Sequence, residues 1–130
     1  MIKQYLVALG TFLLIDGVWL TVVAKNFYAK YLGFLMTKTP NLAAAGIFYL
    51  IYILGMVVLA LGPALQKGSL MSAVLTGALF GLCGYATYDL TNLATIKDWP
   101  LLVTMVDLIW GTVLSGAVAG ISYLILTKWL

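Results

Sequence analysis

The sequence predicts an all-α membrane protein with four transmembrane helices in an antiparallel bundle and an interfacial segment between the first and second helices. Its 130 residues are 64% hydrophobic and only 8% charged, far below the ~25% charged residues usual in soluble domains. The mean hydropathy is +1.10. Four apolar stretches, at about 4–24, 41–65, 70–94 and 101–127, are long enough to cross a bilayer. Short polar connections separate them, so we expect residues 1–130 to form one transmembrane domain.

The first apolar stretch is expected to be a retained helix, because it is too long for the apolar region of a signal peptide and contains Asp16. Lysines and aromatic residues alternate in the segment that follows, 25–40. Such a composition is typical of chain lying at headgroup depth, although an ordinary loop is the alternative. The residues are Lys25, Lys30 and Lys38 with Phe27, Tyr28, Tyr31 and Phe34.

The second and third helices are predicted to form a tight antiparallel hairpin. Pro40 and Asn41 can open the second helix, and the polar, turn-rich stretch 62–69 follows it. In the third helix, Gly77 and Gly81 form a small-xxx-small pair, which lets another helix approach closely. The fourth helix follows Pro100 and carries its own stripe of small residues.

The charged residues exclude several classes of function. All seven basic residues are lysines and there is no histidine. The net charge of +3 is spread over loops and ends, which indicates membrane orientation and not nucleic-acid binding. The balance of lysines favours, by a narrow margin, a cytoplasmic location for the first and third connections. A lone cysteine, Cys83, with no histidine argues against a zinc site and rules out an internal disulfide. No metal-ligating residues and no definite cofactor are predicted, which leaves a proton or a hard cation as the candidates.

Hydrogen-bonding groups are concentrated at residues 84–95, at the end of an otherwise apolar helix. Three aspartates also fall at one depth: Asp16 precedes Lys25 by nine residues, Asp89 precedes Lys97 by eight, and Asp107 follows Lys97 by ten. At about 1.5 Å per residue, all three lie roughly 10–15 Å from the side of the first and third connections. Ionisable groups inside a membrane usually face a bundle interior.

We therefore predict one polar chamber off-centre in the bundle. The alternative is that each aspartate pairs separately with backbone or hydroxyl groups to hold helices together. Three carboxylates with no lysine at their depth cannot all be ionised close together, so a proton or a cation is required. Carboxylate, carboxamide and hydroxyl oxygens suit protons or hard cations. The predicted lining is Asp16, Asp89, Asp107, Tyr85, Asn92, Thr91 and Tyr49, with Trp19 and Trp110 on the faces of Asp16 and Asp107.

A short pattern occurs twice in the chain. Asp-x-x-Trp-x-Thr-Val occurs at 16–22 and again at 107–113. Aspartate and tryptophan are scarce here, so the match suggests internal repetition, a common origin of membrane transport folds.

Several of these motifs resemble a family of small bacterial integral membrane proteins designated domain of unknown function 2177. The resemblance covers nearly the whole chain and implies a bacterial, multi-pass inner-membrane protein with four helices, without implying an activity. The motifs are Tyr-Asp-Leu-Thr-Asn-Leu-Ala-Thr at 88–95 with Trp99-Pro100, Leu14-Ile15-Asp16 through Trp19-Leu20, Asp107-x-x-Trp110-Gly111, Phe27-Tyr28, Phe48-Tyr49-Leu50 and Gly62-Pro63-Ala64-Leu65.

The leading functional hypothesis is proton- or cation-coupled transport or binding of a small ligand. Small multidrug-type transporters are analogous in fold class, but they use one membrane glutamate where this chain has three aspartates. The alternative is a non-catalytic module that binds a lipid or a partner protein. An intramembrane lipid-modifying enzyme is less favoured, because only loop lysines could hold phosphates. We expect a homodimer or other oligomer in the bilayer, since a bundle this small buries little surface.

Overall fold

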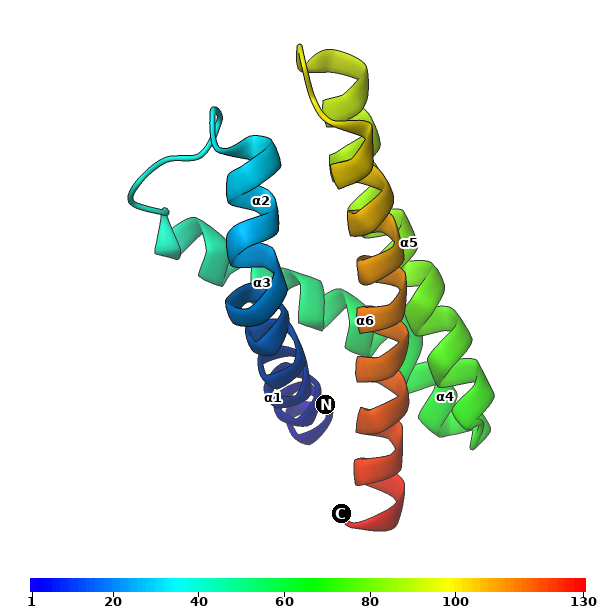
Figure 1. The fold of residues 1–130 in the computed structure, drawn as a ribbon. Helices are drawn as coiled ribbons and strands as arrows, with labels where there is room; N and C mark the ends of the chain where they lie inside the picture. The colour runs from blue at the N-terminus through cyan, green and yellow to red at the C-terminus, as the bar shows by residue number, and fades with distance from the viewer.

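The computed structural model describes residues 1–130 as four long helices joined by short connections (Figure 1). All four are long and apolar enough to cross a membrane, which confirms the predicted all-α four-helix class. Two of them contain a π-helical segment, labelled η1 and η2. The elements are α1 (Ile2–Val18), η1 (Trp19–Ala24), α2 (Lys25–Leu32), α3 (Leu42–Met56), η2 (Val57–Leu61), α4 (Gly62–Lys67), α5 (Leu70–Thr95) and α6 (Leu101–Lys128).

Capping side chains explain where two of the helices begin, and a proline precedes a third. The side chain of Asn41 accepts a hydrogen bond from the backbone N–H of Ala44 at 3.0 Å, and Ser69 accepts one from Ser72 at 3.0 Å. Gly68 ends α4 in the left-handed conformation, with φ of 66°, which glycine adopts without strain. Pro100 precedes α6. The predicted starts at 41, 70 and 101 therefore agree with the structure to within one residue.

The first helix is longer than predicted. It was expected to end at 24, but it continues without a break to Leu32 and spans 31 residues. No glycine or proline interrupts 19–32, and the π-helical turn keeps the backbone bonded there. Half of the predicted interfacial segment is thus helical, and the non-helical connection is 33–41. At ~1.5 Å per residue this helix is about 46 Å long, longer than the ~30 Å hydrocarbon layer, so one end must leave it.

α5 and α6 lie side by side along their length, in opposite directions (Figure 1). Glycines make this possible. A Cβ added to Gly77 would lie 2.6 Å from the Cβ of Ala119, and one added to Gly81 would overlap the carbonyl of Gly111 and the side chain of Ser115. The two backbones therefore meet at these positions. α6 is the most buried helix of the bundle.

Two apolar clusters hold the bundle together. The larger one joins α1, α3, η2, α5 and α6 around fully buried side chains such as Phe12, Met56 and Leu114. The smaller one contains Leu32 and Trp99 and joins α2 to the connection before α6. Both termini lie at the end opposite that connection, where Lys3 Nζ donates to the carbonyl of Leu130 at 2.9 Å.

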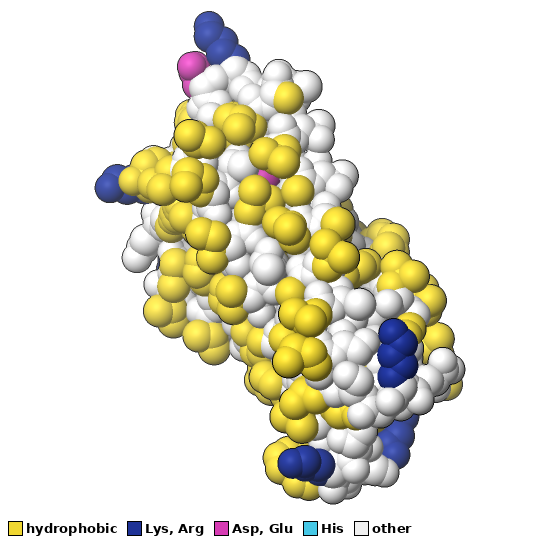
Figure 2. All heavy atoms as spheres, turned by 90° about the vertical axis from the view of Figure 1, so that its right-hand side faces the viewer, with side chains coloured by type: hydrophobic (Ala, Val, Ile, Leu, Met, Phe, Trp, Pro, Cys, Tyr) yellow, Lys and Arg dark blue, Asp and Glu magenta, His cyan; other side chains and the backbone are white.

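The outer surface has the character of a lipid-facing protein. Apolar side chains cover the length of the face in Figure 2, and lysines gather toward the two ends. A small acidic patch is visible partway along this face, in a gap between apolar side chains.

Candidate functional site

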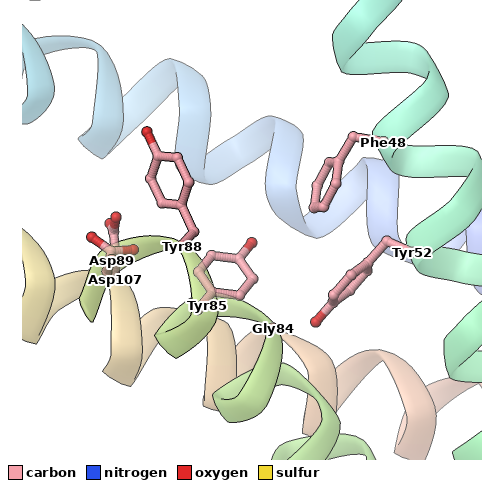
Figure 3. A pocket seen from close by; sticks show the side chains of 7 residues that line it. All are labelled: Phe48, Tyr52, Gly84, Tyr85, Tyr88, Asp89 and Asp107. Carbon is pink, nitrogen blue, oxygen red and sulfur yellow. The ribbon is translucent and has the colours of Figure 1, made fainter. Parts of the chain in front are cut away.

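The centre of the site is a pair of aspartates on neighbouring helices. Asp89 of α5 is 0% exposed and Asp107 of α6 is 6% exposed. Their carboxyl groups lie together, within hydrogen-bonding reach of each other (Figure 3). An ionised carboxyl group offers no donor, and no protein donor reaches either oxygen of Asp89. Burying such a group without a partner is costly, so its presence requires an explanation.

Asp107 has one protein donor. The hydroxyl of Tyr28, from α2, donates a hydrogen bond to its Oδ1. Tyr28 was assigned to the interfacial segment by the sequence and was missed as a site residue. The unbroken helix through 19–32 is what carries its ring to Asp107, and the absence of a helix breaker in that stretch was the available signal.

The carboxyl pair lines a cavity of about 330 Å³ between α3, α5 and α6. The carboxyl groups lie at one end, and the rings of Phe48 and Tyr52 lie at the other (Figure 3). Phe48 is 47% exposed and Tyr88 is 59% exposed, so the cavity opens at the outer surface between α3 and α5. No lysine lines it. Its lining is Phe48, Tyr52, Gly84, Tyr85, Tyr88, Asp89 and Asp107.

Small residues on the helices place these rings. A Cβ at Gly111 would overlap the ring of Tyr85, so the glycine leaves room for that ring beside α6. Across the cavity, the hydroxyl of Tyr52 forms a hydrogen bond with the hydroxyl of Ser115 on α6. The small-residue pattern that packs the helices therefore also sets the walls of the cavity.

Asp16 occupies a different environment. Its carboxylate accepts hydrogen bonds from the hydroxyl of Tyr49 at 3.2 Å and from Nε1 of Trp110 at 3.3 Å. Trp110 in turn stacks on Trp19, with ring centroids 4.2 Å apart and planes at 9°. Asp16 lines a second cavity of about 200 Å³, and Phe48 and Tyr85 line both cavities.

The single chamber expected from the sequence is thus divided into two adjoining cavities. Asp89 and Asp107 share one, whereas Asp16, Tyr49, Trp19 and Trp110 gather in the other, with Tyr85 between them. Asn92 is half-buried and lines neither cavity, and Thr91 is exposed on α5. The aromatic lining residues that the prediction did not include are Tyr28, Phe48, Tyr52 and Tyr88.

The two copies of the Asp-x-x-Trp pattern meet in space. The first copy spans the end of α1 and the start of η1, and the second lies on α6, which runs in the opposite direction (Figure 1). Their tryptophans stack on each other, and the tryptophan of the second copy donates to the aspartate of the first. The repeated residues therefore form one contact between two helices.

The fold and the site define a four-helix membrane protein with a buried carboxyl pair inside an aromatic cavity. The chain belongs to the DUF2177 family of predicted membrane proteins, whose family model matches residues 1–124. No curated protein and no solved structure matches the chain.

Proposed function

We propose that this protein, placed in the bacterial inner membrane, binds a small ligand in the cavity and couples binding to exchange of a proton or cation at Asp89 and Asp107. The observation that carries the proposal is Asp89, which is 0% exposed and has no donor to either carboxylate oxygen. In a membrane such a group is expected to have a functional reason.

The chemistry follows from the contact between the two carboxyl groups. Two adjacent carboxylates in a low-dielectric site repel each other, and a shared proton removes the repulsion and supplies the missing donor. A bound cation can do the same, so a proton and a cation compete for the same site.

The titratable groups that face the pair are Tyr28 from α2, Tyr52 from α3, and Tyr85 and Tyr88 from α5, with Asp16 of α1 in the adjoining cavity. None of them is a cation.

The contrast with Asp16 favours exchange over helix packing. A carboxylate used to hold helices together should accept hydrogen bonds from neighbouring helices, as Asp16 does from α3 and α6. Asp89 accepts none. The hypothesis of separate packing contacts therefore accounts for Asp16 and leaves Asp89 unexplained.

The test is proton release from the purified protein in detergent on addition of sodium, potassium, magnesium or a small organic ammonium ion, followed at several pH values. We expect the wild type to release about one proton per bound cation, because cation and proton compete for the carboxyl pair. Asp89→Asn should release none, because Asp107 then has no second carboxylate beside it whose repulsion requires a shared proton. The affinity of the Asp89→Asn variant for cations should also no longer depend on pH.

Asp98→Asn is the matched control. It removes the same group from an exposed turn where φ is 62°, a conformation that asparagine tolerates as well as aspartate. Its proton release should equal that of the wild type. Undiminished release from Asp89→Asn would contradict the proposal. The proposal would also be contradicted if the wild type released no proton with any of the cations and Asp89→Asn were less stable than the wild type. That result would show that the carboxyl pair serves helix packing.

A further inference from the structure

We infer that the ligand of this site is a small lipophilic organic cation, an ammonium group on an apolar body, which enters sideways from the bilayer between α3 and α5. This inference rests on the proposed function and narrows its ligand to one chemical class. It combines three features of the cavity, namely its aromatic wall, a buried carboxyl group that accepts no hydrogen bond, and its lateral opening.

The wall of the cavity suits a cation that is not strongly hydrated. Four aromatic rings line it, and the face of such a ring attracts an ammonium group within about 6 Å of its centre. The rings are those of Phe48, Tyr52, Tyr85 and Tyr88. A bare hard cation prefers six or more oxygen ligands, and this wall offers mainly ring carbons. An anion would find no basic side chain.

The carboxyl pair supplies the negative charge that attracts a cationic ligand. Asp89 lines the cavity and is fully buried, with neither oxygen accepting a hydrogen bond. An ammonium group at this end of the cavity would give both carboxyl groups a cationic partner, while its apolar body would lie toward Phe48 and Tyr52 (Figure 3). At about 330 Å³, the cavity is at the small end of the ~300–1,000 Å³ range of ligand sites.

The route of entry follows from what blocks the cavity. Toward the connections, the cluster of Leu32, Trp99 and Val103 joins α2 to the start of α6. Toward the termini, the larger cluster around Phe12 and Leu114 fills the bundle. The opening that remains lies between α3 and α5, flanked by the half-exposed rings of Phe48 and Tyr88. That surface belongs to the membrane-spanning part of both helices, so the entrance faces lipid.

A free ammonium compound fits this lining better than an ammonium-bearing lipid headgroup does. A phospholipid headgroup carries a phosphate beside its ammonium group, and a phosphate needs basic partners. None of the residues lining either cavity is basic. The carboxyl pair would repel the phosphate.

The test measures equilibrium binding of radiolabelled benzyltrimethylammonium to the purified full chain in detergent. Neopentylbenzene, which has carbon in place of the charged nitrogen, is the uncharged isostere. We expect the isostere to compete at least about tenfold more weakly, because it lacks the attraction to the carboxyl groups and rings. If neopentylbenzene competed about as well as benzyltrimethylammonium, the result on the wild type alone would overturn the inference.

Variants locate the binding. The double variant Asp89→Asn with Asp107→Asn should abolish binding of the ammonium ion. Phe48→Leu should weaken the ammonium ion about tenfold, through loss of a cation–π contact, and leave the isostere nearly unchanged. Phe34→Leu changes an exposed aromatic residue outside the cavity and serves as the control. Unchanged ammonium binding in both site variants would overturn the inference.

Bilayer composition separates the two sources of an ammonium group. Equal affinity for benzyltrimethylammonium in nanodiscs of phosphatidylglycerol and of phosphatidylethanolamine supports a free ligand. Displacement by phosphatidylethanolamine would overturn it in favour of a lipid headgroup.

The inference and the proposed function can fail separately. Proton release by sodium or magnesium without ammonium binding would overturn the ligand class and leave the coupling intact. Ammonium binding without proton release would leave the ligand class intact and overturn the coupling. Absence of both would overturn both.

Discussion

Asp16 and Asp89 are buried to a similar degree but differ in what surrounds them. Asp16 has a tyrosine and a tryptophan as donors from two other helices. Asp89 faces a second carboxyl group and has no donor. Since a buried carboxylate is stable only with partners, the first is complete within the protein and the second needs something added. On this difference we propose a structural role for Asp16 and a functional role for Asp89.

Tyr28 offers a test of the single hydrogen bond that supports the pair. Tyr28→Phe removes the hydroxyl that donates to Asp107 and keeps the ring. A hydrogen bond to a charged group contributes about 1.5–3 kcal/mol, so we expect a loss of unfolding free energy of that order, measured by titration with a denaturing detergent. Binding of the organic cation should change as well.

The control for this prediction is Tyr31→Phe. Tyr31 lies one turn further along α2, and its ring packs edge-on against Phe27 with centroids 5.0 Å apart. Loss of the Tyr31 hydroxyl should change the unfolding free energy little. Equal stability of wild type and Tyr28→Phe would show that the contact with Asp107 contributes nothing.

The sequence predicted which aspartates are buried in the bundle better than it predicted their hydrogen-bond partners. Helical spacing placed Trp19 beside Asp16, yet the tryptophan that donates to Asp16 is Trp110 from α6. Spacing within one helix shows which side chains share a face, but it does not show which helix that face meets. Thr91 illustrates the same limit, because it neighbours Asp89 in sequence and lies exposed on the outside of α5.

At the scale of elements, the helix starts were predictable and one helix end was not. Asn41, Ser69 and Pro100 are start signals with a direct physical basis. Lysines and aromatic residues after Ala24 indicated an interface, but they are equally compatible with a helix that continues out of the hydrocarbon. The two π-helical segments have no simple sequence signature. The extension that brings Tyr28 to the site therefore required the structure.

The α5–α6 contact is tested by Gly81→Ala. The added methyl group would overlap the carbonyl of Gly111 and the side chain of Ser115. Overpacking of this kind costs about 1–3 kcal/mol, and it would separate the helices that carry Asp89 and Asp107. We expect reduced unfolding free energy in the detergent titration and weaker ligand binding together.

Gly10→Ala is the matched control for that substitution. A Cβ at Gly10 of α1 meets nothing within 4 Å, so alanine should be neutral or stabilising by ~0.5–1 kcal/mol through helix propensity. If the two substitutions had the same effect, close approach of α5 and α6 would not be what glycine provides at 81.

At the scale of the whole molecule, the site lies toward the connection between α5 and α6. Asp89 is six residues before the end of α5 at Thr95, and Asp107 is six residues after the start of α6 at Leu101. Each is therefore about 9 Å from that end of its helix. Counting residues from the lysines indicated a similar off-centre depth. The division into two cavities depends on where Tyr85 and Phe48 lie between the aspartates, which residue counting cannot show.

Oligomeric state and membrane orientation remain predictions. Only 30 of the 130 residues are buried within one chain, and this is consistent with the expectation of a homodimer or other oligomer. The lateral cavity opening between α3 and α5 would have to stay free in such an assembly for the proposed route of entry to operate.

The central claim is that the carboxyl pair holds a proton which a cation displaces. Infrared difference spectroscopy of the protein in lipid, with and without benzyltrimethylammonium, observes this directly through the carbonyl stretch of a protonated carboxyl group. We predict that this band disappears when the cation is added to the wild type and that Asp89→Asn lacks the change. A wild-type spectrum with no protonated carboxyl band before addition, or a band that persists at saturating cation, would contradict the account.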